Sequence, residues 1–270
     1  MGKAGALSLI VSLLCFASCT TRPIYLPDDR IQDVEIIAHR GASLRAPENT
    51  YASVVRAWQL NADAVEIDIR ITGDNHLIAL HDFSTLRTTG THLAVSQTKY
   101  EDIETLDAGS YMSANYTGEK IPLLTELLES VPAGKRLFIE WKGNTEDIRH
   151  LTDLLMNTGL TEKTAVISFN QAALIEIKKK LPSVPCYLLK VTCPEEKLKK
   201  TIFLLNENSL DGLDIYHPSI TEEIVKALHN EGLSCIGWTV NTLNTARRLI
   251  SWGIDGITTN KPGRFAEHLY

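Results

Sequence analysis

The stretch that decides the fold is residues 34–69, VEIIAHRGASLRAPENTYASVVRAWQLNADAVEIDI. It holds an apolar run at 34–38, an amphipathic segment at 50–60 and a second apolar run at 64–69. Asn49-Thr50, just before the middle segment, is typical of a helix N-cap. Two strands joined through a helix predict a parallel pair, because parallel strands need a long crossover connection.

The same alternation of short apolar runs and amphipathic segments continues along the chain. Further strands are expected at 137–141, 164–168, 186–190, 211–215, 234–239 and 255–258, and further helices at 123–130, 145–158, 171–180, 195–206, 220–229 and 242–250. Thr145 and Thr242 indicate two helix starts, and Gly232 and Gly253 two helix ends. Eight strands with helices between them predict an α/β fold, a closed (β/α)8 TIM barrel. A doubly wound sheet is less consistent with the sequence than a barrel, because no glycine-rich phosphate turn follows the first strand.

One long interruption separates the second strand from its helix. A short strand at 77–80 follows the turn Gly73-Asp74-Asn75 and should pair with 64–69 as a hairpin. Residues 83–120 are rich in Thr, Ser, Gly and Tyr and show weak periodicity. We expect this segment to be a small insertion that covers the mouth of the barrel, and not a separate domain.

The length and composition indicate the size of the fold, and the net charge argues against some classes of binding partner. The chain has 270 residues, of which 44% are hydrophobic and 22% charged, enough for one large barrel. Its net charge of -6 argues against nucleic acid, or an anionic membrane surface, as the main partner. An acidic protein that binds a phosphate must therefore supply positive charge locally.

The first 33 residues have the pattern of an exported lipoprotein. Lys3 precedes an apolar stretch at 6–17, which is too short for a comfortable membrane span and predicts a signal peptide at 1–18. Ala17-Ser18-Cys19 resembles a bacterial lipobox, so a lipid on Cys19 is the membrane attachment that we expect; ordinary secretion is the alternative. Residues 19–33 then form a tether, and 34–270 the barrel domain.

The remaining cysteines, Cys186, Cys193 and Cys235, match no zinc spacing. We interpret them as buried structural thiols, with a Cys186–Cys193 bridge as the alternative after export.

Charged and imidazole side chains fall at the carboxyl ends of the predicted strands. Buried charges are costly unless they are paired or bind a metal. Residues two apart on a strand share a face, so Glu66 and Asp68 point to one place, as do Glu140 and Lys142. In a barrel the carboxyl ends of all strands meet at one mouth. Three acids, two imidazoles, an Arg and a Lys at that mouth predict metal-assisted hydrolysis of a phosphate ester; they are Glu66, Asp68, Glu140, His39, His81, Arg40 and Lys142.

These residues belong to a longer series of short motifs. The motifs are His39-Arg40-Gly41, Pro47-Glu48-Asn49-Thr50, Glu66-Ile67-Asp68, His81-Asp82, Ile121-Pro122-Leu123, Glu140-Trp141-Lys142, Ser168-Phe169, Trp238-Thr239-Val240-Asn241 and Gly256-Ile257-Thr258-Thr259-Asn260-Lys261-Pro262. Their order and spacing resemble the glycerophosphodiester phosphodiesterase family. The resemblance covers residues 34–265, and Asn260 stands where the family usually has Asp.

The resemblance implies roles for these residues. Glu66, Asp68 and Glu140 would bind one divalent cation, Ca²⁺ or Mg²⁺, since hard oxygen ligands suit hard cations. His39 and His81 would be the general acid and base, in an order that the sequence leaves open. Arg40 and Lys142 would add positive charge for the phosphate. The strand-end position of Trp238, apart from the resemblance, favours a wall for the glycerol, with a core aromatic as the alternative. The roles of Glu48, Lys190, His217 and Asn260 stay open.

The leading hypothesis is therefore hydrolysis of glycerophosphodiesters to sn-glycerol 3-phosphate and an alcohol, through a cyclic phosphate or by direct attack of water. One alternative is phospholipase-D-like action on lysolipids, which would need an apolar groove beside the mouth. A non-catalytic surface binding lipoprotein is disfavoured because no histidine or acid is missing. A metal-dependent sugar isomerase fits the barrel but not the two histidines. The sequence makes no prediction of the oligomeric state.

Overall fold

The computed structural model describes Met1 and residues 34–269. The described residues form a closed barrel of eight parallel strands, in the order β1-β9-β8-β7-β6-β5-β4-β2, with β2 pairing back to β1. The strands are β1 (Glu35–His39), β2 (Ala64–Ile71), β4 (Arg136–Trp141), β5 (Thr164–Ser168), β6 (Cys186–Lys190), β7 (Gly212–Tyr216), β8 (Ser234–Trp238) and β9 (Gly256–Thr259). This confirms the predicted TIM barrel.

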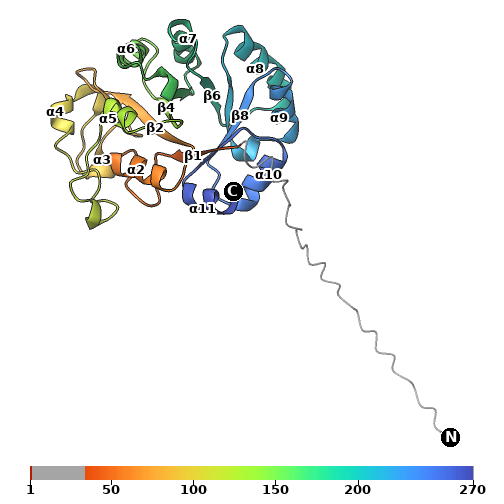
Figure 1. Ribbon diagram of the computed structural model, residues 1–270, viewed down its shortest axis with the longest axis horizontal. Coiled ribbons are helices and arrows are strands. Elements are labelled where there is room, and N and C mark those ends of the chain that lie inside the picture. Colours follow the sequence, from red (N-terminus) through yellow and green to blue (C-terminus); the bar gives the residue numbers. More distant parts are fainter. Residues whose placement is uncertain (2–33, 270) are drawn as a thin grey trace.

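Helices follow the strands and form the outer ring around them (Figure 1). Thr50 and Thr242 accept the capping hydrogen bonds expected of them, at the starts of α2 and α10. The helices are α2 (Tyr51–Gln59), α5 (Leu124–Glu129), α6 (Ile148–Thr158), α7 (Gln171–Lys180), α8 (Glu195–Glu207), α9 (Glu222–His229), α10 (Leu243–Ser251) and α11 (Pro262–Leu269). Among the residues described, no helix combines the length and apolar character needed to cross a membrane.

The strands are buried on both sides, and alternate residues divide between two cores. Val65 and Ile67 of β2 face the helices, in the main cluster. A second cluster fills the inside of the barrel with the side chains of Ile37, Ala64, Phe138, Ala165, Ile167, Tyr187, Leu189 and Ile236. Because the side-chain period of a strand is two, Glu66 and Asp68 face the same interior as Ala64.

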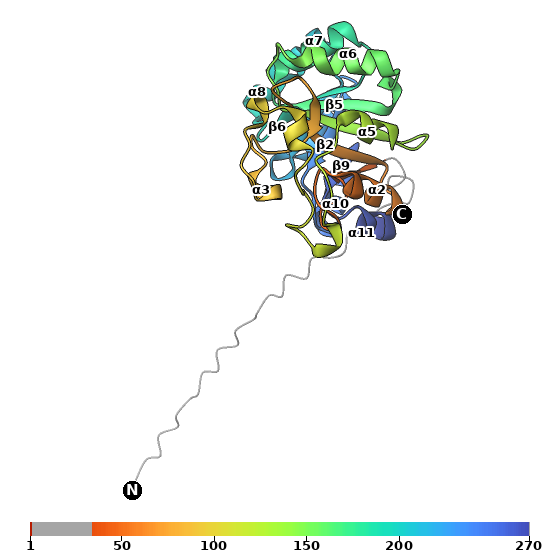
Figure 2. The same cartoon turned by 90° about the vertical axis from the view of Figure 1, so that its left-hand side faces the viewer.

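The segment between β2 and α5 contains the predicted hairpin strand and, after it, the insertion predicted at 83–120. It begins with β3 (Leu77–Ala79), which pairs antiparallel with β2, and continues through the short helices α3 (Leu86–Thr89), η1 (Val95–Gln97), α4 (Tyr100–Ile103) and η2 (Ala114–Tyr116). It has a small core of its own, which includes Ile78, Ile103 and Ile121. Figure 2 faces this segment, drawn in yellow, on the side of the barrel where β2 lies.

Three details differ from the sequence-based expectations. Helix α6 begins at Ile148, because Thr145 bonds to the side chain of Asn170 and does not cap the helix. Helix α11 was not predicted. Cys186, Cys193 and Cys235 are buried free thiols, so the alternative of a disulfide is wrong. The predicted signal peptide, tether and Cys19 fall at 1–33, where residues 2–33 lie outside the described part of the chain.

Candidate active site

The site begins at the turn after β1. The backbone reverses through Arg40 (φ 54°) and Gly41 (φ 77°), both in the left-handed region. A Cβ on Gly41 would lie 2.4 Å from the Ser53 hydroxyl oxygen, so only glycine fits here. The turn directs the Arg40 backbone N–H to Glu66 Oε2, at 2.9 Å, and the Arg40 side chain toward the mouth of the barrel.

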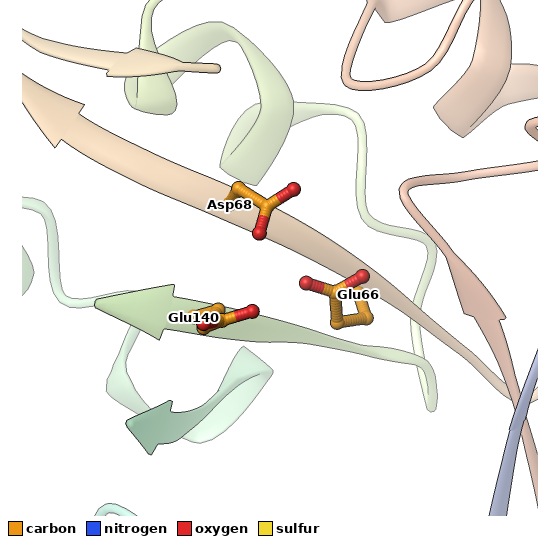
Figure 3. Close-up of side chains that lie close together, drawn as sticks. All are labelled: Glu66, Asp68 and Glu140. Carbon is orange, nitrogen blue, oxygen red and sulfur yellow. The ribbon is translucent and has the colours of Figure 1, made fainter. Parts of the chain in front are cut away.

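Three carboxylates converge beside this turn. Glu66 and Asp68 come from β2, and Glu140 is the register partner of Asp68 on the neighbouring β4. Each contributes one oxygen to a group whose members all lie within 4.8 Å of one another. Figure 3 shows the three carboxylates directed toward a common space between the two strands. Glu66 and Asp68 are buried and Glu140 is nearly so.

Cations and an amide hold this acidic group in place. Lys142 Nζ lies 2.6 Å from Glu140 Oε1 and 3.1 Å from Asp68 Oδ1. Arg40 Nε lies 3.2 Å from Asp68 Oδ2. Asn49 makes two hydrogen bonds to Asp68: its Nδ2 donates to Asp68 Oδ2, and its Oδ1 accepts from the Asp68 backbone N–H.

The electrostatics of the three carboxyl groups favour a bound cation. Burial, together with Asp68 and Glu140, raises the pKa of Glu66 well above its ordinary value. Burial and Asp68 raise the pKa of Glu140 to about 7. Asp68 is also buried, but Lys142 and Arg40 hold its pKa below its usual range. Glu66 Oε1 is buried without a hydrogen-bond partner. Crowded hard oxygen donors, one of them unpartnered, fit a divalent cation such as Ca²⁺ or Mg²⁺.

The two histidines differ in their surroundings. His39 Nδ1 lies 2.7 Å from Asn260 Oδ1, and its Nε2 is 4.0 Å from Glu66 Oε2. Burial, reinforced by Arg40, lowers the pKa of His39 to about 4, so its ring is neutral near pH 7. His81 is more exposed, and its Nδ1 lies 2.7 Å from Asp82 Oδ1.

Glu48 lies in an ion-pair network beside this group. Arg40 Nη1 donates to Glu48 at 2.9 Å, and Arg87 of the insertion donates to both Glu48 oxygens. Arg87 also donates to Asp82, the partner of His81. Glu48 is not part of the group of three acids that could bind a metal among the described residues. The insertion is thereby tied to both His81 and Arg40, which the sequence did not indicate.

A cavity of about 220 Å³ unites these side chains. All the residues predicted for chemistry except Asp68 line it directly, and Asp68 lies behind Lys142 and Arg40. Trp238 lines it as predicted and packs against Phe169 and Tyr216. Lys190 and His217 are not among its lining residues. The sequence reasoning assigned no role to six other lining residues: Ile167, Phe169, Leu189, Asp214, Thr239 and Thr258. Phe169, Thr239 and Thr258 stood in its motifs near strand ends, and that position was the signal that could have found them.

Comparison with known proteins agrees with this geometry. A model of the glycerophosphoryl diester phosphodiesterase family matches residues 39–264. The chain belongs to that family. It is therefore a phosphodiesterase, as the motifs predicted.

The similarity to individual relatives extends over nearly the whole barrel. A glycerophosphodiester phosphodiesterase of Caldanaerobacter subterraneus is 32% identical over 84% of this chain and 94% of its own. One from Bacillus subtilis is 28% identical over 96% of this chain and 94% of its own. Among solved structures, an Oleispira antarctica phosphodiesterase in complex with the product sn-glycerol-3-phosphate superimposes with a TM-score of 0.78 and 27% identity, covering 86% of this chain and 95% of that one.

Proposed function

We propose that this phosphodiesterase hydrolyses glycerophosphodiesters to sn-glycerol 3-phosphate and an alcohol, with one divalent cation, Ca²⁺ or Mg²⁺. The observation that carries the proposal is the convergence of Glu66, Asp68 and Glu140 within 4.8 Å, beside a cavity that two of these acids line together with both histidines. The product complex of the related Oleispira antarctica enzyme supports the choice of substrate.

The acidic group would hold the cation, which when bound supplies charge to the phosphoryl oxygens. Arg40 and Lys142, already in the cavity, orient the phosphate by charge and hydrogen bonds. Lys142, which contacts both Asp68 and Glu140, would keep its ammonium beside these acids and donate to the phosphate. The resulting site concentrates positive charge on an otherwise acidic protein.

The two histidines would divide the proton transfers. The low pKa of His39 keeps its ring neutral, and Asn260 Oδ1 accepts from a proton on Nδ1, which leaves Nε2 free to take a proton from the attacking oxygen. His81, held by Asp82, would then protonate the leaving alkoxide. The attacking oxygen is either the glycerol 2-hydroxyl or water.

A second candidate substrate is a lysolipid, acted on in the same site with phospholipase-D-like chemistry. The observation that favours it is a cavity of about 400 Å³ that shares His81 with the main cavity and includes Phe83 and Leu86. Phe83 is 80% exposed and Leu86 50% exposed, which is unusual for large apolar side chains and suits an acyl chain. The sequence contained no long hydrophobic run to indicate this groove.

We also propose that the protein is exported and attached to a membrane through a lipid on Cys19. The proposal is supported by the pattern of residues 1–19 alone. Replacing Cys19 with Ser should release the protein from the membrane fraction without changing its activity. Retention of the variant in that fraction would contradict the anchor.

The function is tested by release of glycerol 3-phosphate from a panel of glycerophosphodiesters and lysolipids, with Ca²⁺, Mg²⁺ or EDTA. We expect EDTA to abolish turnover and Glu66→Ala to abolish both turnover and cation binding. His39→Ala should abolish turnover while cation binding survives. Glu129→Gln is the control, because it also removes one negative charge but at an exposed position on α5. Normal rates in EDTA, or in His39→Ala, would refute the mechanism.

A further inference from the structure

Asp214 is an acid inside the barrel that the mechanism above does not use. It is the third residue of β7, and its neighbours Leu213 and Ile215 belong to the core beneath the helices. Asp214 therefore points into the barrel, and it is 1% exposed. Its register partners on the flanking strands, Leu189 and Ile236, are both members of the apolar inner cluster.

One carboxyl oxygen of Asp214 is left without a hydrogen-bond partner in these surroundings. Its Oδ1 is buried and has no hydrogen bond among the described residues. Burial, together with Glu140, raises the pKa of Asp214 well above its ordinary value. A buried polar group with no partner is unfavourable, and a charged one is more so. Such a group is satisfied when a ligand brings a hydroxyl to it.

The position of Asp214 indicates which ligand group would reach it. Asp214 lines the same cavity as His39, Glu66 and Lys142. In the closed strand order, β7 is four strands from β2 in either direction, so Asp214 faces the strand that carries Glu66 across the barrel. The three-acid group does not include it, so it is placed to meet the substrate and not the cation.

The wall beside Asp214 is aromatic. Trp238 Nε1 donates to the Asp214 backbone oxygen at 3.2 Å, which holds the indole against the backbone of β7 at this residue. An aromatic face beside a polar group suits a short carbon chain that carries hydroxyls. The cavity of about 220 Å³ is smaller than the roughly 300–1,000 Å³ of drug-sized pockets, so it has room for a phosphate and one short arm.

We propose that Asp214 binds the terminal hydroxyl of the glycerol arm and selects substrates that carry it. This inference rests on the proposed function and names a specificity residue within that site. The 2-hydroxyl must stay near the phosphorus if it is the nucleophile, which leaves the terminal hydroxyl to reach across the barrel. The other alcohol then leaves the cavity at the mouth, beside His81.

The test compares ligands that differ by this one hydroxyl. Binding of glycerol 3-phosphate, of propane-1,2-diol 1-phosphate and of inorganic phosphate is measured by calorimetry on the whole protein with Ca²⁺ or Mg²⁺ present. We expect the wild type to prefer glycerol 3-phosphate over the deoxy compound by about 10- to 100-fold, the effect of losing one partner of a buried polar group.

Two variants then assign the preference to Asp214. Asp214→Leu, which has similar size and no polar atoms, should reduce the preference to about twofold or less and leave phosphate and cation affinity unchanged. Asp214→Asn keeps a hydrogen-bonding group and should retain most of the preference. An unchanged preference in Asp214→Leu, or equal weakening of all three ligands, would overturn the proposal.

Measurements on the wild type alone also test the proposal, in case Asp214→Leu fails to fold. Equal affinity of the wild type for glycerol 3-phosphate and its deoxy analogue would overturn the proposal without any variant. Turnover of glycerophosphodiesters is measured in parallel: its absence with every cation refutes the proposed function, whereas turnover without hydroxyl preference refutes only the role of Asp214.

Discussion

Replacing Glu140 with Gln should stabilise the cation-free protein although it destroys the cation site. The pKa of Glu140 is raised from its ordinary 4.5 to about 7 by burial and by Asp68. A carboxyl whose pKa is higher in the folded than in the unfolded state opposes folding once it ionises, so its cost grows as the pH rises from about 4.5 to 7 and then stays constant. Gln has the same shape and carries no charge.

The pKa difference sets the size of the effect. Linkage gives a cost of about 3 kcal/mol at pH 8 and less than about 1 kcal/mol at pH 5. For a barrel of this size, 3 kcal/mol corresponds to a rise in melting temperature of roughly 6–12 °C. We therefore expect Glu140→Gln to melt higher than the wild type in EDTA at pH 8, with a much smaller difference at pH 5.

The assay is thermal unfolding followed by circular dichroism, in EDTA and then with Ca²⁺ or Mg²⁺. A cation at 100 times its dissociation constant should stabilise the wild type by about 2.7 kcal/mol and the variant much less. Glu129→Gln, which removes an exposed charge, should change stability by less than about 0.5 kcal/mol at either pH. A Glu140→Gln protein that is less stable than the wild type in EDTA at pH 8, or equally stabilised at both pH values, would refute the electrostatic account.

Three further substitutions test the scaffold of the site. Gly41→Ala should destabilise the protein by at least about 2 kcal/mol in urea unfolding, because the new Cβ meets Ser53 at a positive φ; a neutral result would mean that the turn relaxes freely. Asn49→Ala removes both hydrogen bonds to Asp68 and should cost about 2 kcal/mol and weaken cation binding in calorimetry; unchanged binding would show that Lys142 and Arg40 suffice to position Asp68. Thr50→Ala removes the cap of α2 and should cost about 1 kcal/mol in unfolding while cation affinity is kept, so a loss of affinity would contradict a purely structural cap.

The sequence by itself determined the barrel and most of the charged side chains that meet at its mouth. Strand and helix periodicity, with glycine and threonine at the helix ends, is local information, and it placed the elements within a few residues. The rule that strand ends share one mouth then brought Glu66, Asp68 and Glu140 together before any contact was known. Among the predicted helix starts, Thr145 misled, because its hydroxyl has a tertiary partner in Asn170 that competes with the local cap.

Only the tertiary structure decided which of these side chains contact one another. His39 and Asn260 are 221 residues apart, and Arg87 of the insertion reaches Glu48 across 39 residues. Asp214 lies alone in an apolar β7 that resembles any other core strand, so nothing local distinguishes it. Contacts of this kind form because the closed barrel and the insertion bring atoms that are distant in the sequence within about 3 Å of each other. Because these atoms are buried, the presence or absence of a partner has a large effect on the free energy of unfolding.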